Sequence, residues 1–288
     1  MKRIKVFVLV GIMAISLAGC SGKKGSSSEE VTAEDSKDVV TDDVTNKDAE
    51  DEESKVEDFT YQFRSDGDIE IDGYNGSASR IVIPEEIDGH KVVGVSGFNG
   101  NKDITYLSIP ASVKSIGLKA FYDCSSLAQV DMTDGLEEIG EMAFSSCDNL
   151  KEFNMPDTVT SLGEAVLRSS GVESIHISSG LDTLSNYCFA VCESLDGSIT
   201  IPSNIKAIGD YAFQHDSSLT EVVIEEGITS IGTESFGECE KLTKVVIPGS
   251  VDEISGGFRG SKNVTLDVVS GSYAESYAEE NGVTYEVH

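Results

Sequence analysis

The chain has 288 residues, of which 51 are acidic and 21 are basic, and its formal net charge is −30. A uniformly acidic surface repels the phosphates of nucleic acids and of anionic lipids, so the composition argues against a nucleic-acid-binding protein and against direct adsorption to a membrane. Such an excess of acidic residues also keeps a secreted protein soluble.

The first 19 residues have the three parts of an export signal. Three basic residues at the start are followed by an apolar run over residues 6–15 and by small residues before Cys20. About 20 apolar residues are needed to cross a bilayer, so this run is too short for a stable transmembrane helix. We therefore predict that residues 1–19 are a signal peptide.

The four residues Leu17-Ala18-Gly19-Cys20 resemble the lipobox of bacterial lipoproteins. This resemblance implies that a signal peptidase cuts before Cys20 after its sulfur has received a diacylglycerol, and that the mature chain is anchored extracytoplasmically at the cell membrane. Cleavage there removes three basic and no acidic residues, so the net charge changes from −30 to −33. The alternative is an ordinary signal peptide with a cysteine near its cleavage site.

Residues 20–58 would carry the lipid and separate it from the folded part. From residue 29 to residue 58 the chain has 14 acidic residues and 3 lysines, and residues 21–58 contain no aromatic residue. So little apolar surface cannot offset the entropy that is lost when a chain becomes ordered. We predict a disordered acidic linker, and we expect the membrane to be contacted only through the lipid.

From residue 59 onward the sequence repeats with steps of 22 to 24 residues. Its clearest marker is an aromatic position that is filled by Phe98, Phe121, Phe144, Phe189, Phe213, Phe236 and Phe258, with Leu167 in the one gap. Such a period predicts a solenoid, in which each unit buries its apolar side against its neighbours.

One unit read in full shows how a coil should be built. Val130 and Met132 alternate as the inward side chains of a short strand, a second apolar pair turns the chain, and Phe144 closes the far side. We predict an α/β repeat solenoid: a leucine-rich-repeat horseshoe of 22–24-residue units with short strands and short helical or 3-10 turns. A parallel β-helix is the alternative, and helices at the Ala-Phe positions would favour the horseshoe.

The prolines add a second period. All five follow an inward strand residue, and the last four are spaced by 46 residues. The units between them have another residue there and place Gly135, Gly180 and Gly227 two positions later. We infer that a two-repeat unit was duplicated, with proline turns alternating with glycine turns.

Two segments carry a family resemblance. Residues 109–127 and 201–213, which share the pattern of Ile-Pro, a second isoleucine followed by glycine, and Ala-Phe, resemble the BspA-type, or Treponema pallidum-type, leucine-rich repeat. The resemblance covers roughly residues 80–265. It implies a surface or secreted protein, and some members of the family are implicated in adhesion.

The repeats should be capped at both ends, because a solenoid leaves its core open there. We expect an N-terminal β cap and a first repeat over residues 59–97, repeats over 98–265 and a C-terminal cap over 266–288. Within the last, residues 272–281 have the pattern of a serine-capped helix and residues 283–287 that of a strand.

Cysteine and histidine do not indicate a catalytic or metal site. Four cysteines follow the repeat phenylalanine by three residues, and we predict free, mostly buried thiols. A disulfide between Cys124 and Cys147, or between Cys188 and Cys192, is the alternative. The histidines are isolated, and no catalytic or phosphate-binding motif is present. We expect a protein that is not an enzyme and that needs no cofactor or metal.

If the solenoid binds a ligand, the outward residues of its strands are the natural site, because equivalent positions line up from coil to coil. The candidate binding face is Tyr106, Gln129, Asp131, Glu152, Asn154, Ser174, His176, Glu221 and Lys244. We expect a cell-surface module that binds an extracellular protein or glycan. The alternative is a lipoprotein that captures a substrate for a transporter or an envelope enzyme.

Overall fold

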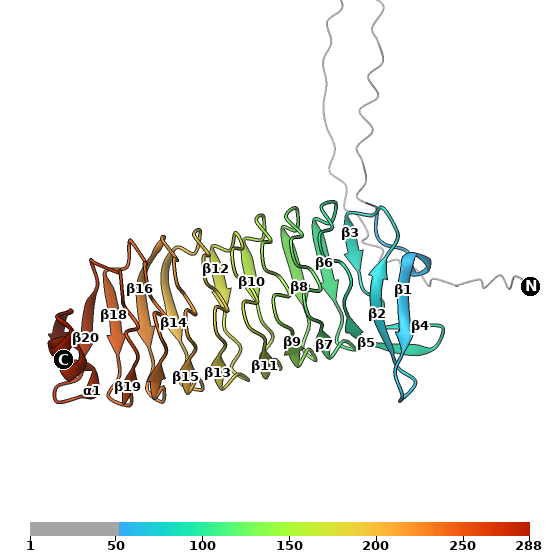
Figure 1. The fold of residues 1–288 in the computed structure, drawn as a ribbon. Helices are drawn as coiled ribbons and strands as arrows, with labels where there is room; N and C mark the ends of the chain where they lie inside the picture. Colours follow the sequence, from blue (N-terminus) through green and yellow to red (C-terminus); the bar gives the residue numbers. More distant parts are fainter. Residues whose placement is uncertain (1–51) are drawn as a thin grey trace, which may run out of the picture. The chain divides into compact units, whose positions relative to one another are not determined.

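The computed structural model describes residues 52–288, which form a single stack of coils (Figure 1). The predicted signal peptide, the lipid site at Cys20 and most of the predicted linker lie outside the described residues and stay predictions. Among residues 52–288, no helix has the length and apolarity that a membrane span requires.

Each coil contributes one strand to a parallel row that we call the strand face. Residues of adjacent strands pair in register, as Leu107 does with Val130 and Val222 with Val245. Most predicted inward positions are buried, as Leu107 and Val245 show with 0% exposure, while Met132 is half-buried against the core. The strands of this face are β3 (Arg80–Val82), β6 (Tyr106–Ile109), β8 (Gln129–Met132), β10 (Glu152–Asn154), β12 (Ser174–His176), β14 (Gly197–Ile201), β16 (Leu219–Ile224), β18 (Lys244–Ile247), β20 (Thr265–Val268) and β21 (Thr284–Val287).

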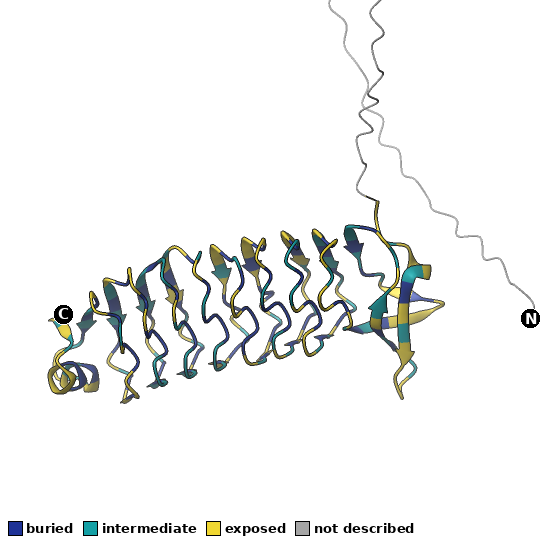
Figure 2. Ribbon diagram, turned by 45° about the horizontal axis from the view of Figure 1, so that its top comes forward, coloured by how far each residue is buried: buried dark blue, intermediate teal, exposed yellow. Residues whose placement is uncertain are grey.

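The second apolar pair of each unit builds a second parallel row. After its first strand, each strand of this row has two residues, of which the second, such as Ile139, is buried. The strands of this row are β5 (His90–Val95), β7 (Ser115–Ile116), β9 (Glu138–Ile139), β11 (Ser161–Leu162), β13 (Thr183–Leu184), β15 (Ala207–Ile208), β17 (Ser230–Ile231) and β19 (Glu253–Ile254). Figure 2 shows buried residues along the length of the stack, between the two rows.

The prediction of short helical or 3-10 turns at the Ala-Phe positions is wrong. The chain forms tight, non-helical turns there. The N–H groups of Lys119, Phe121 and Asp123 donate to carbonyl oxygens of the next coil over 2.8 Å each. The alternate N–H groups, such as that of Tyr122, close turns within the coil. A helix cannot form in this pattern, because it would need every N–H to bond within its own segment.

The backbone angles also exclude a helix at the Ala-Phe positions. Lys119 and Asp123, two residues on either side of Phe121, have φ values of 53° and 58°, and the five following units have the same pair of left-handed residues. A right-handed helical run is interrupted at each of them. Neither helices nor strands stand at the Ala-Phe positions, so this feature does not decide between the two solenoid types considered above.

The predicted horseshoe shape is also corrected. Figure 1 shows the coils of residues 52–288 in a nearly straight row. Horseshoe curvature arises when one side of each coil is wider than the other, as it is when helices face strands. Here backbone hydrogen bonds between coils set the spacing on the turn side as they do on the strand side, so neither side is much wider.

The repeat phenylalanines stack inside the coils. Phe98 and Phe121 have ring centroids 5.0 Å apart, and Phe213 and Phe236 have theirs 5.3 Å apart. Leu167 interrupts this stack, and Phe153 from β10 packs edge-on against Phe144 at 5.1 Å beside the gap. Each such ring pair contributes roughly 0.5–1.5 kcal/mol beyond its buried area.

The alternation of proline and glycine turns has a hydrogen-bond explanation. The Gly135 N–H donates to the Thr158 hydroxyl of the next coil (3.0 Å), and that hydroxyl donates to the Leu136 carbonyl oxygen (2.7 Å). Gly227 and Ser250 repeat the first contact at 3.0 Å. Gly135 has a φ of 130°, and a Cβ there would lie 2.4 Å from the Ala111 oxygen, so a glycine is required.

Aromatic residues from both caps continue the phenylalanine stack. At the start, β1 (Phe59–Phe63) and β2 (Ile69–Tyr74) are antiparallel, β4 (Glu86–Ile87) pairs with β5, and a 3-10 turn covers Val56–Asp58. Tyr74 lies 6.0 Å from Phe98, ring to ring.

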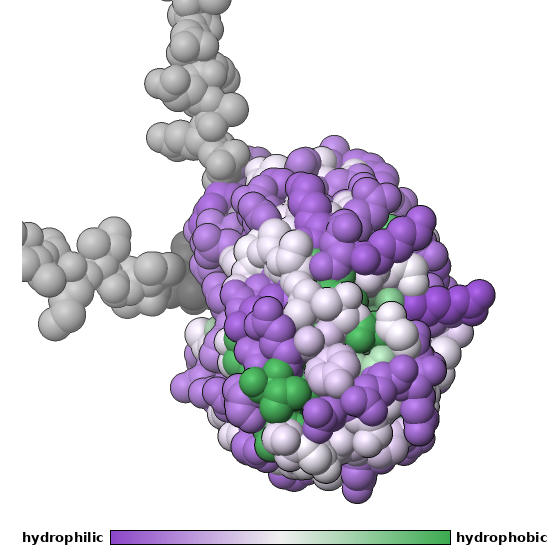
Figure 3. Space-filling model, turned by 90° about the vertical axis from the view of Figure 1, so that its left-hand side faces the viewer, coloured by the Kyte–Doolittle hydropathy of each residue, from purple (hydrophilic) through white to green (hydrophobic). Residues whose placement is uncertain are grey.

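At the other end, the predicted serine-capped helix is confirmed as α1 (Tyr273–Asn281), in which Ser272 accepts from the Glu275 N–H. The α1 residue Tyr277 lies 6.4 Å from Phe258. Figure 3 views this C-terminal end, where hydrophilic surface surrounds small, separate apolar areas.

The prediction of free, buried thiols is confirmed for the described residues, in which Cys124, Cys147, Cys188, Cys192 and Cys239 are all free and buried. The thiols in the slot three residues after the phenylalanine donate to a carbonyl of the preceding coil, as Cys124 does to Phe98 (3.2 Å). Burial raises the pKa of Cys124 to about 11. Such thiols are protonated at neutral pH and act as small apolar side chains.

Asp216 occupies the same slot and is 0% exposed. Its Oδ1 accepts from the Cys192 N–H (2.8 Å), while its Oδ2 has no partner in the described part of the chain. Burial raises the pKa of Asp216 well above its ordinary value.

Candidate functional site

The strand face presents the predicted candidate residues in one outward row. Register pairs Tyr106 with Gln129, Glu152 with Ser174, and Glu221 with Lys244, so equivalent positions do line up from coil to coil. The side chains of Gln129, Asp131, Glu152, Asn154, Ser174 and His176 are exposed, and those of Tyr106, Glu221 and Lys244 are half-buried. Whether this row binds a ligand stays a prediction.

Tyr106 is less available for ligand binding than its outward position in the row indicates. The Arg80 guanidinium lies 3.8 Å above its ring, and its hydroxyl donates to Asp131 Oδ2 (2.7 Å). This hydrogen bond, together with partial burial, raises the pKa of Tyr106. One face of the ring is covered, so Tyr106 is a poor stacking platform for a ligand.

The far end of the row is an ion-pair cluster. Lys244 Nζ lies 3.0 Å from Asp267 Oδ2, and His288 Nδ1 lies 2.6 Å from Asp267 Oδ1. The hydrogen bonds from Lys244 and His288 lower the pKa of Asp267, and the bond to Asp267 raises the pKa of Lys244. Asp267 was not among the predicted site residues, and its pairing leaves Lys244 already neutralised.

The strand face is divided into three separate sheets. β3, β6 and β8 form the first, β10 and β12 the second, and β14, β16, β18, β20 and β21 the third. The first break therefore lies between β8 and β10, and the second between β12 and β14. Both breaks fall in the middle of the candidate row.

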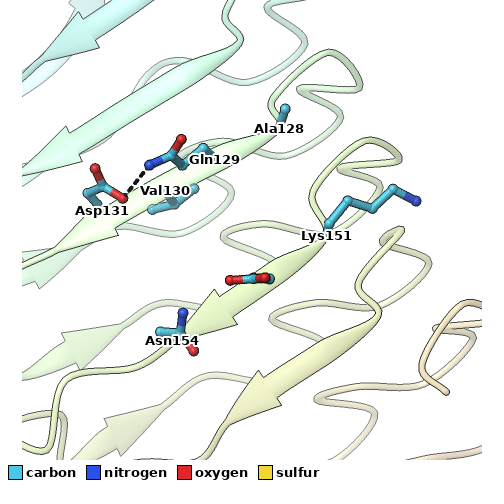
Figure 4. A pocket seen from close by; sticks show the side chains of 7 residues that line it. Ala128, Gln129, Val130, Asp131, Lys151 and Asn154 are labelled. Atoms are coloured by element: carbon cyan, nitrogen blue, oxygen red, sulfur yellow. Dashed lines mark hydrogen bonds between the residues drawn. The ribbon is translucent and has the colours of Figure 1, made fainter. Parts of the chain in front are cut away.

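A cavity opens at each break. Opening 1, between β8 and β10, has a volume of about 400 Å³ and is lined by Ala128, Gln129, Val130, Asp131, Lys151, Glu152 and Asn154 (Figure 4). Opening 2, between β12 and β14, has a volume of about 290 Å³ and is lined by Ile175, His176, Ile177, Ser198, Ile199, Thr200 and Pro202. Five of the predicted candidate residues lie in these two linings.

Several inward residues beside the breaks are slightly more exposed than their equivalents in other coils. Val130 beside opening 1 is 8% exposed, Ile199 beside opening 2 is 6% exposed, and Ile175 is half-buried. The equivalent residues away from the breaks, Leu107 and Val245, are 0% exposed. The openings therefore bring apolar surface to the floor of a polar face.

Local sequence differences explain both breaks. Phe153 stands where other coils have a smaller aliphatic residue, and its ring needs more room beside β8 than valine or leucine does. Leu195 and Ile199 are four residues apart, where other coils have three, and the extra residue produces a bulge at Gly197. These irregularities are visible in the sequence and could have indicated where the face opens.

The described residues contain no group of three or more His, Cys, Asp or Glu side chains that could hold a metal ion. Asp216, the carboxyl with the strongest burial, lies inside the core among thiols and away from both openings.

Comparisons with known proteins agree with this architecture. A family model described as "BspA type Leucine rich repeat region" matches residues 74–196 and 172–265, with six copies. The crystal structure of the leucine-rich repeat protein TpLRR of T. pallidum is 26% identical, has a TM-score of 0.52, and is matched over 82% of this chain and 98% of that one.

Two further solved structures are similar in fold. A leucine-rich repeat protein from Bacteroides ovatus is 24% identical, with a TM-score of 0.47 over 76% of this chain and 71% of that one. A leucine-rich cell surface protein from Faecalibacterium prausnitzii is 17% identical, with a TM-score of 0.46 over 81% of this chain and 94% of that one. A comparison with curated proteins finds no significant match.

Proposed function

The chain belongs to the BspA-type leucine-rich repeat family, and we propose that its folded part is a binding module held outside the cell membrane by a lipid on Cys20. Proteins of this repeat family are typically non-catalytic binding proteins. The observation that carries the proposal is the strand face. It is a solvent-exposed row whose register repeats from coil to coil and which is interrupted by two cavities.

The location rests on the sequence alone. The pattern of residues 1–20 supports export and lipid attachment, and the acidic segment that follows would hold the solenoid away from the anionic membrane surface. Cys20→Ala is expected to move the chain from the membrane fraction to the soluble extracytoplasmic fraction. Membrane attachment that survives this substitution would contradict lipid anchoring at Cys20.

A screen of glycans, matrix proteins and whole cells tests the binding role. Once a partner is found, we expect the combined charge reversal of Asp131, Glu152 and Glu221 to lysine to weaken its binding more than tenfold. The control reverses Glu138, Glu141 and Glu253, which are exposed as Asp131 and Glu152 are but lie on the second row and the turn side. Equal loss of binding in both triple variants would contradict a role for the strand face.

Capture of a small substrate is a second candidate. Opening 1 has a volume of about 400 Å³, which lies within the range of about 300–1,000 Å³ that is usual for small-molecule sites. Thermal unfolding in the presence of amino acids, short peptides and oligosaccharides would support capture if one of them raises the unfolding temperature in a saturable way. No shift with any of them would count against it.

A further inference from the structure

The two openings flank a two-stranded sheet and differ in chemistry. β10 and β12 pair with each other and with no other strand of the described chain, and opening 1 and opening 2 lie on either side of them. Adjacent parallel strands are about 4.8 Å apart, so two coil steps separate the openings by about 10 Å. One extended ligand can therefore reach both.

Opening 1 is suited to a cation. The Asp131 carboxylate already accepts from Tyr106 and from Gln129 (2.9 Å), as the dashed line in Figure 4 shows for the latter. The Glu152 carboxylate, in contrast, has no hydrogen-bond or ion-pair partner within residues 52–288. Lys151, the basic residue at the rim, is held by Glu173 at 3.0 Å and does not neutralise it.

Opening 2 is suited to an apolar group. Its floor consists of Ile175, Ile177 and Ile199, and Pro202 closes one side. His176 at its rim is turned to Asp157 (3.5 Å). Apolar groups gain free energy in proportion to the surface that they remove from water, and the half-buried Ile175 supplies such surface.

We propose that openings 1 and 2 together bind an extended polypeptide segment that carries a basic side chain and, about 10 Å from it, an apolar side chain. The basic group pairs with Glu152, and the apolar group covers Ile175. A polypeptide fits better than a glycan, because sugars are commonly held against an open aromatic face, and the ring of Tyr106 is covered by Arg80. The acidic charge of the whole chain also attracts a basic segment over long range.

This inference rests on the proposed binding function and narrows it to a class of partner. A polyproline II segment places residues i and i+3 on the same side, about 9 Å apart, without an entropic cost for straightening. The probe is therefore a fluorescein-labelled peptide with the core Arg-Pro-Pro-Leu and Gly-Ser flanks. Its matched controls have the cores Glu-Pro-Pro-Leu and Arg-Pro-Pro-Ser.

Fluorescence anisotropy with the purified chain measures the affinities. We expect saturable binding of the first peptide, at least tenfold weaker binding of each control peptide, and at least tenfold weaker binding of the first peptide to Glu152→Gln and to Ile175→Ser. Glu138→Gln, an exposed glutamate on β9 of the second row and away from both openings, is expected to change the affinity less than twofold. Circular dichroism confirms that each variant is folded.

Three results would overturn the proposal. Equal affinity for the three peptides, equal weakening by Glu152→Gln and Glu138→Gln, or no saturable binding up to millimolar peptide would each show that the openings do not recognise this pair of side chains. The proposed function is distinguished from it by the partner screen. If a partner binds the chain and its affinity is unchanged by Glu152→Gln and Ile175→Ser, the proposed binding function is retained and only the proposed peptide site is refuted.

Discussion

The carboxyl group of Asp216 offers a direct test of how the coils are joined. In the equivalent slot two coils further on, the Ser261 hydroxyl accepts from the Cys239 N–H (2.9 Å) and donates to the Phe236 carbonyl oxygen (2.6 Å). Asp216 makes the first of these contacts through Oδ1. Its Oδ2 has no hydrogen-bond partner in the described chain, so an ionised carboxylate there would be buried without compensation. We therefore expect Asp216→Asn, a neutral side chain of the same shape, to keep the Oδ1 contact with Cys192 and to avoid that buried charge.

The magnitude follows from proton linkage. Burial raises the pKa of Asp216 in the folded chain well above its value of about 3.9 in an unfolded chain. Below the unfolded pKa both states bind the proton, and stability does not depend on this group. As the pH rises from there toward the folded pKa, only the unfolded state releases its proton, so the wild-type chain loses about 1.4 kcal/mol of stability per pH unit. Asp216→Asn has no such loss.

Urea unfolding of both chains from pH 4 to pH 8 measures the difference. We expect the two free energies of unfolding to agree near pH 4 and the asparagine variant to become the more stable one as the pH rises. Cys239→Ser, a neutral change in an equivalent slot, is the control and should leave the pH dependence as in the wild type. A variant that is less stable by about 1.5–3 kcal/mol at all pH values above 5 would instead show that Asp216 is ionised and holds a charged hydrogen bond.

Four further predictions concern hydrogen bonds, backbone strain and packing in the coils. Thr158→Val removes the hydroxyl that bridges a glycine turn to the next coil and should lower the free energy of urea unfolding by about 1–2 kcal/mol. Ser112→Ala should leave it unchanged or slightly raised, because the buried Ser112 hydroxyl has no partner in the described chain. Val191→Gly should raise it by about 1 kcal/mol, since a β-branched residue is held there at a φ of 63°; a decrease would contradict the strain argument. Leu167→Phe alone should lower the free energy of unfolding by about 1–3 kcal/mol, because the larger side chain overpacks the core. In a double-mutant cycle this loss should become smaller when Phe153→Val is also present. Additive losses would show that the two side chains do not share one space.

The sequence predicted those features of the fold that depend on periodicity alone. The inward and outward positions of the strands, the repeat position of the phenylalanines, the helix that begins after Ser272 and the buried thiols all follow from the pattern of residue types. The turn at the Ala-Phe positions could not be predicted in this way. Its conformation depends on N–H groups such as that of Phe121 bonding to the neighbouring coil, and local preference for helix carries no information about that partner.

The sequence predicted which residues form the row of the candidate face, but it did not predict the two openings in that face. Glu152 and Asn154 could be assigned to the outward side from alternation, but a break in the sheet depends on how one coil packs on the next. Phe153 packs its ring against Phe144 in the preceding coil, and Gly197 lies at the register shift of the one coil that has an extra residue. Each change departs from the repeat, and it alters how one coil packs against the next.

This distinction bears on where recognition can reside in a solenoid. Features shared by every unit, such as the stacked rings and the bonded turns, are required for each coil to hold its neighbour, so they give stability along the whole stack and cannot distinguish one position from another. A ligand that binds one place must contact what the other coils lack. In residues 52–288 the departures at Phe153 and Gly197 are also the places where the strand face opens and the inward residues become exposed. The irregular coils are therefore the part of the surface where specificity for a partner can arise, and substitutions that restore the repeat there should reduce binding without reducing stability.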